Sequence, residues 1–364
     1  MAKEKKEKRE TIDEKIAWLL DLNKRHSEEF VGTRPQRQLY RIKHPTEIAV
    51  FKCMDGRLHI PTATNMPLGI IRPYRNVGGY FDLGWPLLGE DLMDWVEYGI
   101  SKGKRSLILV TYHFSKGESS RGCAGFNCDC EAAVQFANKL HRQVNRFFGH
   151  DNRVVFPIVV GFETDTDSLI FHSQDQKNQK IIACSDEMSD DPIDLMAMIT
   201  ELYPNMDNEV KQDLMPLIKG NIAHIKEVKE EGRNLDDMQH KEWMLLVGSG
   251  SDWLHIPNTA LIIGPFDPDL SKPIIKAISI IESNMKSKRI NDDGFLILSS
   301  VPFAEEGIDK NRAREKANFL QAYMREIIKT YYPHLLEKAR FMSTVIDERT
   351  RRMEHILETM KIEY

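Results

Sequence analysis

Cysteine is scarce in this chain. The 364 residues include only Cys53, Cys123, Cys128, Cys130 and Cys184. An odd number of cysteines argues against the disulfide framework that small secreted domains use. The first ten residues, MAKEKKEKRE, lack the apolar segment of a secretory signal, and we expect a solvated charged tail there. The thiols are therefore expected to be reduced, as buried core residues, metal ligands or nucleophiles.

The sequence also lacks long apolar runs and a strong charge of either sign. No apolar run is long enough to span a membrane. The net charge of −5 gives no reason to expect nucleic-acid binding. With 41% hydrophobic and 29% charged residues, the composition is typical of a soluble globular protein large enough for two domains. We therefore expect a cytoplasmic protein without nucleic-acid or membrane partners.

Apolar patterns in the first 240 residues predict strands that alternate with helices. Helices are expected over 12–30, 88–101 and 129–148, and strands over 49–54, 105–113 and twice within 153–173. Residues 66–86 are rich in glycine and proline and are expected to be an excursion with a short apolar core. Residues 190–240 are polar and helical and mark the expected domain boundary. The alternation predicts an α/β domain with a largely parallel sheet.

The same pattern resumes after the boundary. Strands are expected over 242–250, 259–266 and 294–300, and helices over 272–288, 309–330 and 332–362. The predicted fold is two duplicated α/β domains with mostly parallel sheets, flanked by an N-terminal helix and C-terminal helices. We divide the chain into a helical extension (1–45), a first domain (46–235), and a second domain with the C-terminal helices (236–364).

The second half resembles a copy of the first. Residues 51–61, FKCMDGRLHIP, align with 247–257, VGSGSDWLHIP, and residues 106–114, SLILVTYHF, align with 295–303, FLILSSVPF. The reactive residues of the first copy align with unreactive ones in the second: Cys53 with Ser249, Asp55 with Ser251, Arg57 with Trp253, and His113 with Pro302. The duplication therefore predicts a single reactive site, in the first half.

Three potential metal ligands gather where predicted strands end. Cys53 ends one strand, His113 ends the next, and Cys123 follows a polar loop. In open α/β sheets, ligands bind beyond the carboxyl ends of the strands. Two sulfurs and one imidazole suit zinc and leave its fourth position open, as catalytic sites require. We therefore predict a zinc site formed by these three residues.

Other interpretations of the cysteines stay open from the residues alone. Cys128 or Cys130 could supply a fourth ligand and close the site, as in structural zinc centres. The spacing C-x-C also allows a redox pair, although redox motifs are usually C-x-x-C. Cys53 or Cys123 could be a nucleophile. The start of a predicted helix at 129 favours packing or solvent exposure for Cys128 and Cys130.

Several short motifs together resemble a known enzyme family. CMDGR resembles the Cys-x-Asp-x-Arg signature of β-class carbonic anhydrases, and RPYRNVGG (72–79) resembles the segment that follows it there. LILVTYH and GCAGF resemble the strand, histidine and Cys-Gly motif that complete the zinc site, although the ten residues from His113 to Cys123 exceed the usual spacing. With a degenerate second copy, residues 46–330 are similar to the carboxysome shell carbonic anhydrase subfamily, a fused pseudo-dimer in which one half keeps zinc.

The resemblance implies a carbonic anhydrase. It implies reversible hydration of CO2 to bicarbonate, with Zn²⁺ held by Cys53, His113 and Cys123 and a zinc-bound hydroxide as nucleophile. Asp55 would accept a hydrogen bond from that hydroxide. Arg57 would hold Asp55 away from the metal through a bidentate ion pair. The resemblance also implies a homo-oligomer, a dimer of pseudo-dimers.

Alternative functions keep the same fold. A hydrolase of COS or CS2 could use the same site, and a non-catalytic zinc or scaffold protein of a carboxysome-like assembly would need a closed site. Contacts with a carboxysome shell or Rubisco, and a carboxysomal location within the cytoplasm, follow from the subfamily resemblance alone.

Two further sets of residues attract functional interpretations. His59, His172 and Tyr112 are candidate proton shuttles, but His59 recurs as His255 in the copy without ligands, which favours a packing or capping role. The segment ETDTD (163–167) could bind Ca²⁺, but it lacks the glycine and distal glutamate of an EF-hand loop. We expect it to form a turn between two strands.

Overall fold

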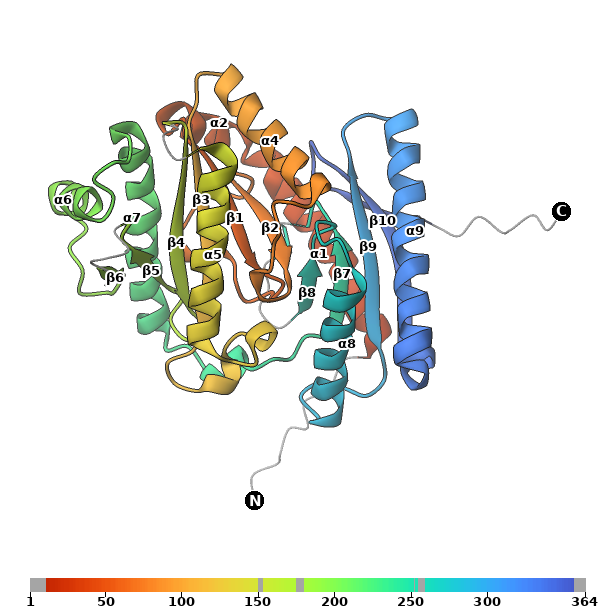
Figure 1. Ribbon diagram of the computed structural model, residues 1–364. Helices are drawn as coiled ribbons and strands as arrows, with labels where there is room; N and C mark the ends of the chain where they lie inside the picture. The colour runs from red at the N-terminus through yellow and green to blue at the C-terminus, as the bar shows by residue number, and fades with distance from the viewer. Residues whose placement is uncertain (1–10, 150–152, 175–179, 252, 255–258, 357–364) are drawn as a thin grey trace.

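Two β-sheets form the framework of the molecule (Figure 1). The computed structural model describes residues 11–149, 153–174, 180–251, 253–254 and 259–356. The predicted charged tail at 1–10 and residues 255–257 of the second LHIP segment lie outside the described residues. The predicted α/β class with two mostly parallel sheets is confirmed.

The first sheet contains six strands in the order β2-β1-β3-β4-β5-β6. Their bounds are β1 Glu47–Cys53, β2 Ile71–Asn76, β3 Ser106–Phe114, β4 Val155–Glu163, β5 Ser168–His172 and β6 Ile181–Ala183. The first four strands are parallel, and β5 and β6 are antiparallel to their neighbours. β1 lies between β2 and β3, and this inner position explains its unbroken apolar run.

The second sheet contains five strands in the order β11-β10-β9-β7-β8. Their bounds are β7 Met244–Gly248, β8 Ala260–Ile263, β9 Phe295–Phe303, β10 Ala339–Asp347 and β11 Met353–His355. When β7 is matched to β1 and β9 to β3, the five strands follow the order of the first five strands in the other sheet. The bounds of β3 and β9 coincide with the segments that align in sequence. The predicted duplication of the framework is therefore visible in the topology.

Helices cover both sheets. Their bounds are α1 Ile12–Gly32, α2 Arg34–Lys43, α3 Ile60–Ala63, α4 Pro86–Ser101, α5 Cys130–Phe148, α6 Pro192–Leu202, α7 Asn208–Glu231, α8 Ser271–Lys286 and α9 Ile308–Tyr331. α5 packs on β3 and β4, and α9 packs on β9 and β10 (Figure 1). α1 reaches across to the second sheet, where Asn23 accepts a hydrogen bond from the amide of Met353 (2.8 Å). The N-terminal helix thus packs on the second sheet.

Two predictions of secondary structure are wrong. Residues 332–356 do not form a helix, because a short 3₁₀ segment leads into β10 and β11. The end of the predicted helix, 357–362, lies outside the described residues. The β-branched run Thr344–Ile346 favours a strand, and parallel pairing with β9 buries it. Residues 66–86 contain β2, which pairs with β1 along its whole length. Its Pro73 is tolerated because β2 lies at the edge of the sheet.

The two halves meet beside the end of β1. The amide of Ile262 donates to the carbonyl of Met54 (2.8 Å). Gly56 permits this approach, because a Cβ at that position would lie 2.5 Å from the carbonyl oxygen of Ala260. The segment that follows Cys53 is therefore held against β8. Among the described residues, every helix is too short or too polar to cross a membrane.

Candidate metal centre

The structure brings Cys53, His113 and Cys123 together. β1 and β3 are parallel neighbours, so Cys53, the last residue of β1, and His113, near the end of β3, lie at the same edge of the sheet. Cys123 reaches them from the loop that follows β3. The ligand atoms of the three side chains all lie within 4.8 Å of one another, and all three residues are buried. The long spacing from His113 to Cys123 does not prevent convergence.

The donor set fits zinc. The two sulfurs lie 3.8 Å apart. Two sulfurs bound tetrahedrally to zinc at about 2.3 Å would be separated by about 3.8 Å. Both ring nitrogens of His113 are buried without a hydrogen-bond partner in the described part of the structure. Buried polar groups usually have a hydrogen-bond partner. A metal ion bound to the imidazole would take the place of that partner.

The thiols influence one another. The hydrogen bond between them and the neighbouring His113 lower the pKa of Cys53 well below its ordinary value, although burial acts in the opposite direction. The same hydrogen bond and burial raise the pKa of Cys123. One thiol of the pair is thus favoured as a thiolate, which is the form that binds metals.

Cys128 and Cys130 stay outside the cluster. Cys130 begins α5, and Asp129 caps that helix by accepting a hydrogen bond from the amide of Ala132 (3.0 Å). Within the described ranges, the group around His113 includes no third sulfur. Cys184 is buried elsewhere, and burial raises its pKa to about 12. The geometry does not favour a closed structural site.

Asp55 and Arg57 form a buried ion pair next to the three potential ligands. Arg57 Nη2 donates to Asp55 Oδ2 (2.6 Å), and Arg57 Nε donates to Asp55 Oδ1 (3.0 Å). The amide of Arg57 also donates to Oδ1 (2.9 Å). Burial would raise the pKa of Asp55, but the charge and hydrogen bonds of Arg57 outweigh it and hold that pKa well below its usual range. Asp55 is therefore an ionised acceptor.

Sequence reasoning missed a second layer around Arg57. Arg57 Nη1 donates to the carbonyl of Met238 (2.6 Å), and Nη2 donates to His240 Nε2 (3.0 Å). His240 Nδ1 lies 3.0 Å from a carboxylate oxygen of Glu242. Burial alone would lower the pKa of His240, but the charge of Glu242 outweighs it, and the net shift of this pKa is upward. These residues precede β7, and no spacing rule connects them with a motif 180 residues earlier.

This layer is an ion-pair network with its own support. The oxygens of Asp55 and Glu242 and a nitrogen of His240 lie within 4.8 Å of one another, but Arg57 bridges Asp55 and His240. Glu242 is fully buried, and Asn284 Nδ2 donates to its backbone carbonyl (3.0 Å). A guanidinium shared by a carboxylate and an imidazole has little freedom to rotate. The network therefore fixes the direction in which Asp55 points.

The candidate proton shuttles lie elsewhere. His59 is the N-cap of α3 and accepts a hydrogen bond from the amide of Thr62 (3.2 Å), so its expected capping role is confirmed. The hydroxyl of Tyr112 lies 2.9 Å from His172 Nε2. Tyr112 precedes His113 in the strand and points to the opposite face of the sheet. The pair formed by Tyr112 and His172 is therefore separated from the ligand cluster by the sheet.

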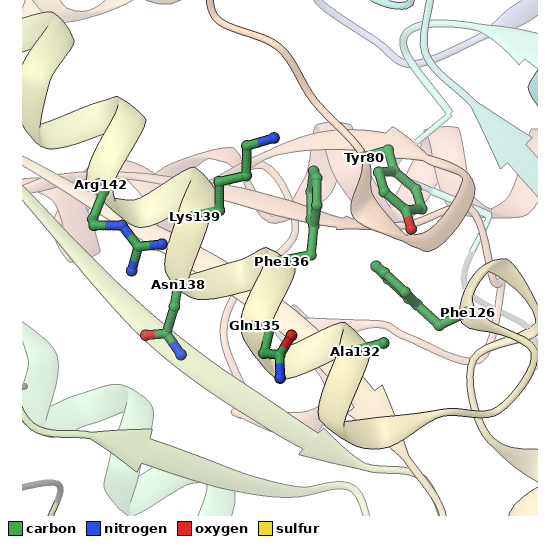
Figure 2. Close-up of a pocket in the computed structure, with 8 residues that line it drawn as sticks. All are labelled: Tyr80, Phe126, Ala132, Gln135, Phe136, Asn138, Lys139 and Arg142. Carbon is green, nitrogen blue, oxygen red and sulfur yellow. The ribbon is translucent and has the colours of Figure 1, made fainter.

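A cavity of about 630 Å³ lies beside the loop that carries Cys123. Figure 2 shows Tyr80, Phe126 and Phe136 facing one another, with Lys139 further along α5. The rings of Tyr80 and Phe126 stack with centroids 4.7 Å apart. The amide of Phe126 donates to the carbonyl of Cys123 (3.1 Å). The aromatic cluster of Tyr80, Phe126 and Phe136 thus packs against the segment that follows Cys123.

Comparison with known families agrees with this geometry. The family model described as "Carboxysome Shell Carbonic Anhydrase, catalytic domain" matches residues 43–240, which is more than half of the chain. The match begins just before β1 and ends at His240, so it includes all the residues of the cluster and of the Asp55–Arg57 pair. No curated protein matches the chain.

Proposed function

The chain belongs to the carboxysome shell carbonic anhydrase family and is a carbonic anhydrase, and from this premise we propose that it hydrates CO2 reversibly to bicarbonate at a zinc ion held by Cys53, His113 and Cys123. The proposal rests on the convergence of three buried ligand atoms, two sulfurs and one imidazole nitrogen. Both ring nitrogens of that imidazole, His113, have no hydrogen-bond partner among the described residues. The donor set leaves one tetrahedral position for solvent, as catalytic zinc sites require.

The zinc ion would supply chemistry that no side chain here provides. Bound zinc lowers the pKa of a water molecule from 15.7 to about 7, which makes a nucleophile available near neutral pH. Cys53 and Cys123 would each contribute a thiolate, and His113 a neutral imidazole.

Asp55 would orient the attacking water. Its carboxylate is ionised and buried, and it can accept a hydrogen bond only from a group that carries a proton. Acceptance of that bond would direct a lone pair of the water oxygen toward CO2. Arg57 would hold the carboxylate in the acceptor role and prevent it from becoming a fourth metal ligand, because both of its oxygens are engaged by the guanidinium.

The second half would complete the site without supplying a metal ligand. His240 and the carbonyl of Met238 contact Arg57, and they follow the proposed boundary at residue 235. We propose that residues 46–235 carry the reacting groups, that residues 236–364 position them, and that residues 1–45 form a helical extension. The family name leads us to propose association with a carboxysome shell. We also propose that the enzyme is a homo-oligomer.

One experiment tests the proposed function directly. Stopped-flow CO2 hydration would be measured on protein of known zinc content, for wild type and His113→Ala. A matched control is Pro302→Ala, the aligned position in β9. We expect one zinc ion per wild-type and control chain, and we expect His113→Ala to lose both zinc and activity. Full activity in a zinc-free His113→Ala protein would disprove the proposal.

A further inference from the structure

The loop between β3 and α5 carries Cys123, and its polar groups meet the turn between β4 and β5. That turn contains the acidic segment ETDTD, residues 163–167. β3 and β4 pair in parallel up to Phe114 and Glu163, so the loop and the turn leave the sheet side by side. The acidic turn therefore faces the start of the loop that delivers a potential metal ligand.

Asp165 is the centre of the contact. Its two oxygens accept hydrogen bonds from the hydroxyl of Ser115 (2.9 and 2.8 Å). Oδ2 also accepts the amide of Gly117 (2.8 Å), and Oδ1 accepts Arg121 Nε (3.0 Å). The side chains of Arg121 and Asp165 are only 7% and 10% exposed, so solvent weakens this ion pair little. Arg121 lies two residues before Cys123, so this ion pair holds the end of the loop that carries the potential metal ligand.

Glu163 fixes the turn that presents Asp165. One of its oxygens accepts the amides of Lys116 (3.2 Å) and Asp165 (3.0 Å). The other accepts the amide of Thr166 (3.1 Å) and its hydroxyl (2.6 Å). The oxygens of Asp165 and Glu163 are thus occupied by donors of the protein, and these two acids clamp the loop.

The second half lacks the long loop, and its equivalent turn keeps an acid only at some of the positions. β9 and β10 pair up to Phe303 and Asp347, which makes Asp347 the counterpart of Glu163. The amides of Thr164 and Glu348 donate to the equivalent carbonyls of Phe114 (2.9 Å) and Phe303 (3.0 Å).

Two acids of the first turn have become arginines in the second. Asp165 corresponds to Arg349, and Asp167 corresponds to Arg351. The connection after β9 is only the four residues 304–307 before α9 begins. The acidic turn therefore occurs in the half that has a ligand loop to hold.

We propose that Asp165, with Arg121 and Glu163, is a positioning residue of the metal centre: it holds the loop at 115–123 in the conformation that delivers Cys123. This inference rests on the proposed zinc site. A loop of nine residues has many alternative conformations, and ordering it before the metal binds removes an entropic cost that metal binding would otherwise bear. Partners outside the ligand shell typically change metal affinity roughly 10- to 100-fold.

The test measures metal affinity, which does not depend on turnover. Zinc affinity would be determined by competition with a chelator for wild type, Asp165→Asn and Arg121→Gln. The thiolate-to-metal absorption of the Co²⁺-substituted protein would report how many sulfurs remain bound. Asp167→Asn is the matched control, because Asp167 belongs to the same turn but pairs with Arg233 (2.6 Å) and His224 (2.9 Å) instead of the loop.

We expect Asp165→Asn and Arg121→Gln each to weaken zinc binding roughly 10- to 100-fold. The loss of affinity in the double variant should not exceed the product of the two single losses. Asp167→Asn should bind zinc as wild type does. If Asp165→Asn binds zinc as tightly as wild type, or if Asp167→Asn loses as much affinity, the clamp is disproved. If Cys123→Ser binds zinc as wild type does, the proposed site itself fails.

Discussion

The two halves of the molecule share a framework and differ at the ends of their strands. β1 and β7 occupy the same place in their sheets, as do β3 and β9. In the first half these strands lead into Cys53, His113 and the long loop to Cys123, whereas Ser249, Pro302 and a short connection take those places in the second. The difference indicates that the cluster of potential ligands depends on a few residues at the ends of two parallel strands and in the loop that follows them. The segment just before β7 contacts Arg57 through His240 and the carbonyl of Met238.

The largest expected effect in this comparison comes from the buried ion pair. Arg57→Gln leaves the Asp55 carboxylate buried without a cation, and we expect a loss of about 3–5 kcal/mol in the free energy of unfolding. We also expect CO2 hydration to fall, because Asp55 is freed to bind the metal. Urea denaturation and stopped-flow assays measure the two effects.

A matched control for this variant is Arg72→Gln, which breaks a partly exposed pair with Asp91 (2.8 Å). We expect it to change the free energy of unfolding by only about 0–1 kcal/mol. Equal losses in the two variants would contradict the importance given to the buried pair.

A smaller effect is expected from His240, in the segment that precedes β7. His240→Gln removes the imidazole between Arg57 and Glu242, and we expect CO2 hydration to fall about tenfold while zinc content stays unchanged. His224→Gln, a buried histidine paired with Asp167, is the control and should retain full activity. Unchanged activity in His240→Gln would show that His240 does not position the Asp55–Arg57 pair.

A further effect concerns pH. Burial raises the pKa of Glu242, but the charge of His240 outweighs it and the net shift is downward. A carboxyl group whose pKa is lower in the folded state stabilises the fold above its unfolded pKa, roughly 4.3 for glutamate, and this contribution is lost as the pH falls through the folded pKa. We therefore expect the free energy of unfolding to fall as the medium is acidified below about pH 4.

Denaturation curves between neutral and acidic pH, for wild type and Glu242→Gln, measure this contribution. The variant should lose less stability on acidification than wild type does, because it has no carboxyl group to protonate at this position. A parallel decline in both proteins would refute the assignment.

The smallest effect is expected at Cys128 and Cys130. Neither thiol belongs to the ligand cluster, so Cys128→Ser and Cys130→Ser should leave zinc content and activity unchanged. Atomic absorption on purified variants measures the zinc content. A loss of zinc in either variant would favour the closed structural site.

Much of the fold and part of the candidate site could be predicted from the sequence. Cys53 and His113 end apolar runs, and parallel neighbours bring their ends together, so local pattern sufficed for them. β10 escaped prediction because its polar and apolar residues do not alternate cleanly, and pairing with β9 decides its structure. His240 escaped because only the packing of the second half against the first brings it to Arg57.

The acidic turn illustrates the same limit. ETDTD was expected to be a turn, and it is one. Its contacts with Ser115 and Arg121 depend on the register of β3 and β4, which cannot be predicted from the sequence pattern. Contacts between elements far apart in the chain therefore account for most of what sequence reasoning missed.

We propose one zinc ion bound by two sulfurs and one imidazole, with a position left for solvent. X-ray absorption at the zinc edge of the zinc-loaded protein measures this coordination. We expect two sulfur neighbours at about 2.3 Å and two nitrogen or oxygen neighbours at about 2.0–2.2 Å. A shell with three or four sulfurs, or with none, would contradict it.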